Sequence, residues 1–351
     1  MRRFHRIRPL VLAALLALGA TQAPNACTRV LHTFAEQNLT LTARSMDWYV
    51  RYPTTLWKFP RGMKRSGLTG KNPAQWTSRY GSLALVQTAD GQSATADGLN
   101  EKGLVANLLY LAETQYPKRN PETPGVASSI FLQYLLDNFA TVAEAVAFLE
   151  KGSIQIVPVP IPNSEHLPTM HIALSDAGGD SAIVEFLDGK TVIHHDRGYQ
   201  VMANSPIFEK QLALTAYWNE IGDVFLPGTR KSPDRFVRAD YYNRKLPKPK
   251  SYDEAIASLL SIMRNVSSPF GEADPQKPNI STTMWRVVHD QSHLRLFYES
   301  TVAPNVVWVD LAGFDFAPGT PVKKLEMENK ALNGNVTKRF EKSQPLQFAR
   351  P

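Results

Sequence analysis

The sequence predicts an α+β fold in which antiparallel strands come first, helices follow and strands return. Two Asp-Gly pairs, at residues 90–91 and 188–189, each separate two short alternating apolar segments, which is the signal of a β-hairpin. Helical patterns occupy parts of the middle of the chain. Alternating segments then return at 283–290, 293–300 and 305–311. Strands grouped in hairpins, with separate helices, favour antiparallel sheets.

The first two strands are expected at residues 27–34 and 39–44, on either side of a short polar turn. The two Asp-Gly hairpins supply four further strands, which are expected at 83–88, 93–97, 182–187 and 191–195. These segments contain enough alternating apolar residues to cover one face of a sheet.

Helices are expected at residues 128–139 and 141–151. The second opens with a Thr-x-x-Glu capping box and stops at Gly152. A later helix opens with a Ser-x-x-Glu box at Ser251. It places its apolar residues on one face: Ile256, Leu259, Leu260 and Met263.

The N-terminal 26 residues have the pattern of a secretory signal peptide. A basic start is followed by an apolar run at residues 9–20 and by small and polar residues up to Ala26. The run is too short to span a membrane, which takes ~20 apolar residues. Removing its four arginines lowers the formal net charge from +7 to +3, so no nucleic-acid partner is expected. We therefore expect a periplasmic or secreted protein without stable membrane insertion after cleavage.

The rest of the chain, residues 27–351, reads as a single domain without a linker or an internal repeat. Residues 317–351 turn polar and basic, and we expect them to form a C-terminal tail on the surface. The chain has one cysteine, which excludes a disulfide scaffold and a zinc or iron–sulfur site built from cysteines. His194 and His195 are adjacent in an expected strand and would point to opposite faces, so they cannot chelate one metal together.

The single cysteine, Cys27, directly follows Ala26 and would become the N-terminus after signal cleavage. Three interpretations are open. A lipid could be attached to the thiol, although Pro24 stands where lipoproteins usually have leucine. The residue could be a buried apolar cysteine. It could also be an N-terminal nucleophile whose own α-amine acts as the base.

The residues that follow Cys27 favour the third interpretation. The opening hairpin returns Arg44 and Asp47 to the side of Cys27. An N-terminal amine has a reference pKa of ~7.7 and a thiol one of ~8.5, both close to neutral pH. A carboxylate and a guanidinium beside them could fix the amine and decide which group carries the proton.

Five stretches in this order resemble the choloylglycine hydrolase family, which comprises penicillin V acylases and conjugated bile acid hydrolases. They are Cys27 to Arg29 with Arg44 to Trp48, Gly98 to Leu104, Val201 to Pro206, Leu226 to Gly228 with Arg235 to Arg238, and a late segment from Thr283 to Asp310. The resemblance is to exported members of Gram-negative type. It implies a four-layer αββα sandwich of the N-terminal nucleophile hydrolase type, an amidohydrolase of linear amides, and no cofactor.

The resemblance also implies a role for each motif residue. Cys27 would be the nucleophile, and Arg44 and Asp47 would hold its thiolate and amine. The side chain of Asn204 and the main-chain N–H of Tyr110 would bind the oxyanion. One further catalytic residue would lie close to the nucleophile: Arg235. Without the support of the motifs, Asp47 and Asn204 could equally be turn residues, and Arg235 could be a surface charge. Arg238, one helical turn later, is expected at the surface.

The substrate is expected to be a small-molecule amide with an apolar acyl group. Trp48, Leu108 and Leu109, together with the side chain of Tyr110, would line the acyl side. Tyr110 resembles penicillin V acylases, which suggests penicillin V or N-acyl homoserine lactones. Conjugated bile acids are the alternative substrate. The span between Asn204 and Arg235 is shorter than in bile acid hydrolases, whose longer insert there is used in tetramer assembly. The short span therefore argues against bile acids, and it leaves the oligomeric state open, with a homo-oligomer as one of the alternatives.

Two non-catalytic interpretations accompany these expectations. The protein could be an exported lipoprotein binding module anchored at Cys27. The stretch from Arg51 to Tyr80 has seven basic and no acidic residues, and it is either a solvated loop or a rim that attracts acidic substrates.

Overall fold

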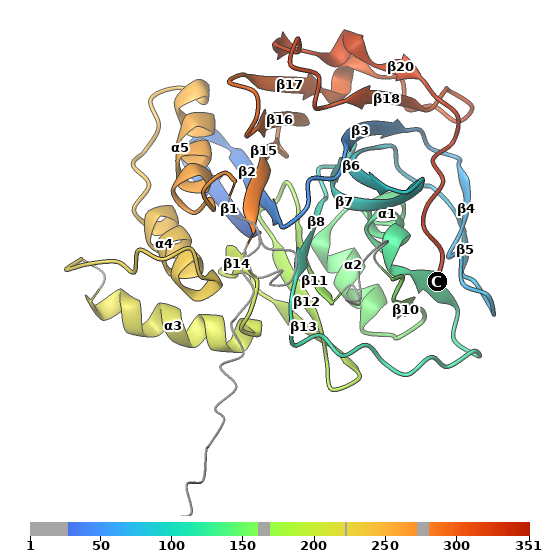
Figure 1. Cartoon of the computed structure of the whole chain (residues 1–351), viewed down its shortest axis with the longest axis horizontal. Coiled ribbons are helices and arrows are strands. Elements are labelled where there is room, and N and C mark those ends of the chain that lie inside the picture. The colour runs from blue at the N-terminus through green and yellow to red at the C-terminus, as the bar shows by residue number, and fades with distance from the viewer. Residues whose placement is uncertain (1–26, 161–168, 222, 272–280) are drawn as a thin grey trace, which may run out of the picture.

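The computed structural model describes residues 27–160, 169–221, 223–271 and 281–351. The expected signal peptide, residues 1–26, lies outside the described residues. Two large sheets form the centre of the molecule (Figure 1). The first has seven strands in the order β14 (Val201–Ala203), β1 (Thr28–Phe34), β2 (Leu39–Trp48), β15 (Thr282–Asp290), β16 (Arg295–Ser300), β17 (Val306–Asp310) and β19 (Gly334–Asn335).

The second sheet has nine strands. Their order is β13 (Lys190–His195), β12 (Ser181–Leu187), β11 (Met170–Ser175), β8 (Val105–Tyr110), β7 (Gln92–Asn100), β6 (Ser82–Ala89), β3 (Thr54–Phe59), β18 (Lys323–Glu326) and β20 (Glu341–Lys342). Two small sheets pair β9 (Gly125–Ala127) with β10 (Gln155–Val157) and β4 (Lys64–Ser66) with β5 (Gln75–Thr77). Nearly all pairings in the two large sheets are antiparallel, as the hairpin signals predict.

Helices cover the outer face of each large sheet, which gives four layers. On one side α1 (Ser128–Asn138) and α2 (Val142–Leu149) pack on the nine-stranded sheet. On the other side, α4 (Ser232–Arg244) and α5 (Tyr252–Asn265) pack on the seven-stranded sheet, and α3 (Phe208–Ile221) packs on α4. Figure 1 shows the two groups of helices on opposite sides of the sheets. The α+β class and the αββα sandwich are confirmed.

Alternation along the nine-stranded sheet assigns its residues to two different cores. Val105, Leu109 and Ile183 belong to the cluster shared with the seven-stranded sheet. Ala106 and Val184, on the opposite face, belong to the cluster under α1 and α2. Since successive strand residues point to opposite faces, this sheet is buried on both sides.

The interior between the two sheets contains several buried polar groups. Thr42 on β2 and Ser175 on β11 join their hydroxyls across it at 2.7 Å. Arg29 on β1 donates to the Leu174 carbonyl at 3.3 Å and to the Ser181 hydroxyl at 3.2 Å. Buried polar groups are costly without partners, so these bonds fix how the sheets face one another.

The capping and turn signals are confirmed. Thr141 and Ser251 each accept a hydrogen bond from the main chain three residues later. Gly152 has φ +61° just after α2, a conformation that glycine adopts without strain. Asp90 and Asp188 also take positive φ at the first position of their hairpin turns, as the twist of a two-residue hairpin requires.

Two helices, α3 and α4, are absent from the sequence-based expectations. The buried face of α4 carries Arg235, Arg238 and Asn243 beside Phe236, so no purely apolar stripe marks it. Arg238 is 8% exposed and donates to the main-chain carbonyls of Pro227 and Thr229. The expectation that it would lie at the surface is therefore wrong, because its charge satisfies carbonyls that precede α4.

The C-terminal segment does more than cover the surface. Strand β18 pairs with β3, and β20 pairs with β18, so residues after 317 extend the nine-stranded sheet. Val322, Leu325 and Ala349 are buried. The basic stretch from Arg51 to Tyr80 contains the strands β3, β4 and β5, and Lys58 within β3 is only 2% exposed. Between these strands the stretch is loop, where Arg61, Lys71 and Arg79 are exposed, so the alternative of a solvated loop holds for part of it. No helix in the described part of the chain is long and apolar enough to cross a membrane.

Candidate active site

Cys27 directly precedes β1, which lies between β14 and β2 in the seven-stranded sheet. The register of β1 with β2 pairs Thr28 with Ser45 and Arg29 with Arg44. The thiol is 2% exposed, and its Sγ lies 3.7 Å from Met46 Sδ and 3.8 Å from the Asp47 carbonyl. The hairpin therefore brings residues 44–47 to the cysteine, as its length predicts.

Arg44 points from β2 into the space between the sheets. Its Nη2 lies 3.4 Å from Cys27 Sγ and donates to the Leu108 carbonyl at 2.7 Å. Its Nη1 donates to the Ala96 carbonyl at 3.2 Å and lies 3.5 Å from an oxygen of Asp97. Contacts to two strands of the opposite sheet fix the guanidinium, and its charge favours a thiolate at Cys27.

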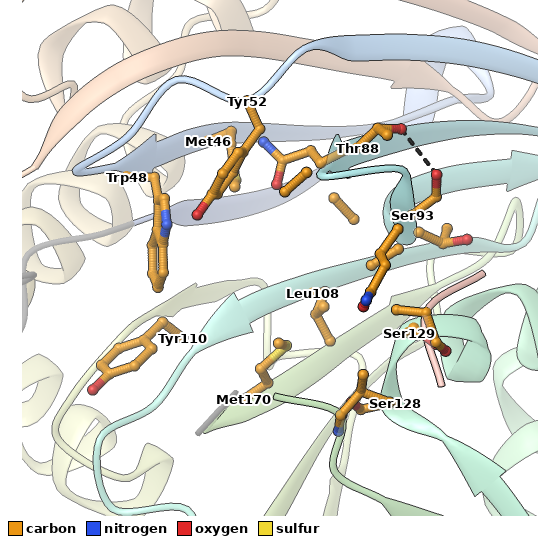
Figure 2. Close-up of a pocket in the computed structure, with 18 of the residues that line it drawn as sticks. Met46, Trp48, Tyr52, Thr88, Ser93, Leu108, Tyr110, Ser128, Ser129 and Met170 are labelled. Carbon is orange, nitrogen blue, oxygen red and sulfur yellow. Dashed lines mark hydrogen bonds between the residues drawn. The ribbon is translucent and has the colours of Figure 1, made fainter. Parts of the chain in front are cut away.

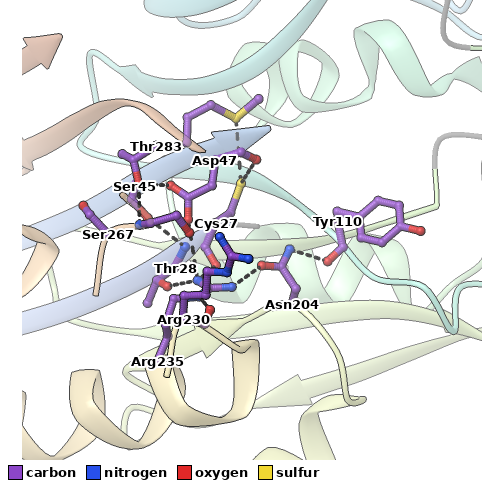
Figure 3. Close-up of polar contacts among 12 residues, drawn as sticks. Cys27, Thr28, Ser45, Asp47, Tyr110, Asn204, Arg230, Arg235, Ser267 and Thr283 are labelled. Carbon is purple, nitrogen blue, oxygen red and sulfur yellow. Dashed lines mark hydrogen bonds and ion pairs between the residues drawn. The ribbon is translucent and has the colours of Figure 1, made fainter. Parts of the chain in front are cut away.

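Asp47 points toward the other side of the seven-stranded sheet and is fully buried. Its Oδ1 accepts a hydrogen bond from the Thr283 hydroxyl at 2.7 Å, on the neighbouring strand β15. Its Oδ2 lies 3.8 Å from Arg235 Nη1 and, within the described residues, receives no hydrogen bond. Figure 3 shows this carboxylate beside Cys27. A buried carboxylate oxygen with spare acceptor capacity suits a positively charged amine.

Arg235 connects the cysteine with Asn204. From α4 its Nη1 donates to the Cys27 carbonyl at 2.6 Å and to the Thr28 hydroxyl, and its Nη2 donates to Asn204 Oδ1 at 3.0 Å. Both Arg235 and Asn204 are fully buried. The alternative of a surface charge is therefore wrong for Arg235, and the alternative of a turn residue is wrong for Asp47, which lies inside β2. Asn204 lies at a bend directly after β14, so its position in a turn and its contact with Arg235 occur together. Figure 3 shows the chain of contacts from Cys27 through Arg235 to Asn204 and Tyr110.

The Asn204 amide nitrogen donates to the main-chain carbonyl of Tyr110 at 2.5 Å. Because Oδ1 of Asn204 is engaged by Arg235, its Nδ2 must be the donor side, facing β8. Asn204 thus stands beside the end of β8, where the main chain of Tyr110 runs. The role of the Tyr110 N–H as an oxyanion donor stays a prediction.

Burial controls the charge of the groups in this centre. Burial raises the pKa of the Cys27 thiol, while the nearby Arg44 charge opposes that rise. Burial also lowers the pKa of the Arg235 guanidinium, and the Asp47 carboxylate counteracts this. With its nitrogen still in a peptide bond, Cys27 therefore favours the unreactive thiol.

One cavity extends from the cysteine between the sheets and α1. Cys27, Trp48, Leu108, Leu109 and Tyr110 all line it. Figure 2 shows Trp48 and Tyr110 at one side of it, with Leu108 and Met170 toward the middle. The Trp48 and Tyr110 rings are 5.8 Å apart between centroids, a contact that gives this side a rigid aromatic wall. The four residues expected on the acyl side thus share one cavity with the thiol.

Several residues of the centre were not expected from the sequence. Asp97 accepts from Asn107 at 2.7 Å, contacts His289, and faces Arg44. Thr283 holds Asp47. Asp97 directly precedes the Gly98 motif, which is the only local signal for it, and Thr283 begins the late motif segment.

Most of the histidines that the structure describes pair with carboxylates. No group of three or more potential ligands lies together in the described residues. His194 lies 3.4 Å from Glu185, and His195 2.9 Å from Asp180. Burial, which alone would raise the pKa of Glu185, is outweighed by hydrogen bonds from His171 and His194, which lower it to about 2.

Comparison with known proteins decides the family. The model of the linear amide C–N hydrolases, choloylglycine hydrolase family, matches residues 27–322. The chain belongs to this family. It is a hydrolase of amide C–N bonds, and an α+β fold of the N-terminal nucleophile type is shared with its structural neighbours.

Relatives within the family are of two kinds. In an alignment of 368 positions the chain is 44% identical to penicillin V acylase of Pectobacterium atrosepticum, covering 98% of each chain. It is similar to the solved penicillin V acylase of Agrobacterium tumefaciens, with a TM-score of 0.85, 47% identity, and coverage of 93% of this chain and 100% of that one. A bile salt hydrolase/transferase of Clostridium perfringens is 25% identical, over 89% of this chain and 95% of its own. The likeness to penicillin V acylases is thus the stronger.

Proposed function

We propose that the mature chain begins at Cys27 and hydrolyses amides through this residue as an N-terminal nucleophile. The observation that carries the proposal is the buried thiol between Arg44, 3.4 Å from its sulfur, and Asp47, whose open oxygen suits the α-amine. An amine beside its own thiol can take the proton that burial otherwise keeps on sulfur.

In the first half-reaction, the α-amine accepts the thiol proton and Cys27 Sγ attacks the amide carbonyl carbon. The carbonyl oxygen becomes an oxyanion, which the Asn204 side chain and the Tyr110 main-chain N–H stabilise. Each such donor is commonly worth ~3 kcal/mol. The C–N bond then breaks, the α-ammonium gives its proton to the departing amine, and a thioester remains on Cys27.

In the second half-reaction, a water molecule gives a proton to the α-amine as its oxygen attacks the thioester carbon. The C–S bond breaks, the carboxylic acid leaves, and the proton returns to the sulfur. Arg44 holds negative charge on sulfur in both halves, and Asp47 with Arg235 holds the first residue in place.

We propose that the substrates are amides whose acyl group is apolar and either flexible or flat. Penicillin V and long-chain N-acyl homoserine lactones belong to this class. The rings of Trp48 and Tyr110 with Leu108 and Leu109 support this, because each buried methylene contributes ~0.8 kcal/mol. The higher identity to penicillin V acylases than to bile salt hydrolases supports it as well.

A panel of three substrates tests this class. Values of kcat/KM are measured for penicillin V, an N-dodecanoyl homoserine lactone and glycocholate. We expect the first two to be cut faster than glycocholate. A preference for glycocholate of about tenfold, equal to ~1.4 kcal/mol, would replace the proposal with bile acid hydrolysis.

We also propose that residues 1–26 direct export to the periplasm or beyond and are then removed. The basic and apolar pattern of this segment supports export. The intact mass of the exported protein tests it: a chain starting at Cys27 supports the proposal. A lipid adduct on Cys27 would block the thiol and support the anchored binding module instead.

A further inference from the structure

One residue of the C-terminal segment, which comprises residues 343–351, lies at the far side of the Cys27 cavity. Ala349 lines the same cavity as Cys27 and is 6% exposed. Figure 2 shows Ser93, Ser128 and Ser129 on the side opposite Trp48 and Tyr110. The segment therefore meets the cavity at the end away from the aromatic wall.

Two hydrogen bonds hold the main chain at Ala349. Its N–H donates to the Ser93 carbonyl on β7 at 2.9 Å. Its carbonyl accepts from the Ser129 hydroxyl, in the first turn of α1, at 2.6 Å. Both anchoring residues line the cavity themselves, so the position of Ala349 relative to it is fixed from two elements.

The preceding residue, Phe348, anchors the segment from the other side. Its ring packs against the two hydrophobic clusters on the outer side of the nine-stranded sheet. The Arg65 guanidinium lies 5.8 Å from the ring centroid and is itself paired with Asp137 on α1 at 2.9 Å. Packing of Phe348 and the two hydrogen bonds of Ala349 hold this part of the segment in place, so that Ala349 is a fixed part of the cavity wall.

We infer that Ala349 sets the depth of the acyl cavity, so that the C-terminal segment determines which acyl lengths are accepted. This rests on the proposed function, in which the acyl group occupies this cavity. Alanine leaves the end of the cavity open to the last carbons of a long chain, whereas a large side chain there would occupy their place. The segment lies beyond residues 27–322, the part that the family model matches.

The test replaces Ala349 with phenylalanine in the mature protein, with Gln347→Phe as the matched control. Gln347 is exposed in the same segment, two residues earlier. The kcat/KM ratio for N-dodecanoyl over N-hexanoyl homoserine lactone is measured for each. Ala349→Phe should lower this ratio about tenfold or more, the discrimination that one or two misplaced methylenes produce, while Gln347→Phe should leave it unchanged.

An unchanged ratio in folded Ala349→Phe overturns the inference. If that variant does not fold, deletion of residues 345–351 is measured instead. The deletion opens the cavity and should raise the same ratio, and a folded deletion variant with the original ratio again overturns the inference. Failure of the unaltered protein to cut either lactone would overturn the proposed acyl specificity, and this inference with it. Cleavage of both with no change on substitution would overturn this inference alone.

Discussion

Two buried arginine–aspartate pairs lie on opposite sides of the nine-stranded sheet. Arg44 and Asp97 meet between the two sheets at 3.5 Å, and Arg65 and Asp137 meet on the α1 side at 2.9 Å. None of the four side chains is more than 7% exposed. Each guanidinium also lies over an aromatic ring, Trp285 for the first at 4.9 Å and Phe59 for the second at 4.6 Å.

The two pairs differ in the other groups that their arginines contact. Arg44 has the Cys27 sulfur at 3.4 Å, whereas Arg65 has the side chains of Met63 and Phe348. One arginine–aspartate pair therefore lies beside the Cys27 thiol, and the other lies beside Phe348 of the C-terminal segment. A buried pair alone is no sign of catalysis, and only the group beside it distinguishes the two roles.

The largest effect on activity is expected from removing the Cys27 thiol, which lies beside the Arg44–Asp97 pair. Cys27→Ser should lower kcat/KM for penicillin V by at least about a thousandfold, because a hydroxyl is a far poorer nucleophile beside the same amine. The thermal unfolding midpoint should change little, since the replacement is small. Full activity in a correctly processed variant would refute Cys27 as the nucleophile.

The next effect separates the two arginines. Arg44→Gln should lower kcat/KM about a hundredfold, because the positive charge that stabilises a thiolate at Cys27 is lost. Arg65→Gln is the matched control. It should lower the unfolding free energy by roughly 3 kcal/mol, since a buried partner is left unpaired, yet keep the activity of the folded protein. Activity and thermal unfolding are measured on both variants. Equal losses of activity would contradict the claim that only Arg44 acts on the thiol.

A smaller effect is expected from the two aspartates. Asp97 contacts Arg44, and we expect it to act through Arg44 as a positioning residue, so Asp97→Asn should lower kcat about tenfold with little change in KM. Asp137→Asn should leave both constants unchanged, and burial already raises the pKa of Asp137, which reduces the cost of a neutral side chain. A rise in KM alone for Asp97→Asn would argue for a purely structural role.

The smallest effect is a shift in the pH dependence of thiol alkylation. In a protein that keeps a residue before Cys27, burial raises the thiol pKa above its ordinary value. The thiolate is the reactive form, so the alkylation rate should rise with pH through a midpoint above that value. Arg44→Gln should move this midpoint higher and Arg65→Gln should not. The chain has one cysteine, so the labelling reports Cys27 alone.

The features that could be predicted from the sequence are those set by residues close together in the chain. Asp-Gly turns and capping boxes mark hairpins and helices within a few residues, and they are confirmed. Cys27, Arg44 and Asp47 lie on one hairpin, so strand geometry alone brings them together. Asn204 and Arg235 were expected only through the family resemblance, because no local rule links them to Cys27.

The rest depends on contacts between distant parts of the chain. Asp97 meets Arg44 from the opposite sheet, 53 residues away, and Ser129 meets Ala349 across 220 residues. Helix α4 was missed because its inner face is partly charged, and this is also why it can hold Arg235 at the site. A polar segment such as residues 343–351 looks like a surface tail until its partners are known.

The central claim is that Cys27 is both the N-terminus and the nucleophile, and one measurement tests both at once. The exported protein is mixed with a long-chain N-acyl homoserine lactone, quenched in acid, and digested with trypsin, which cuts after Arg29. The account predicts that the peptide of residues 27–29 is recovered with a free N-terminus in resting protein. In quenched protein the same peptide should carry the mass of the acyl group. An active protein whose peptide still includes Ala26, or whose acyl group lies elsewhere, would contradict the account.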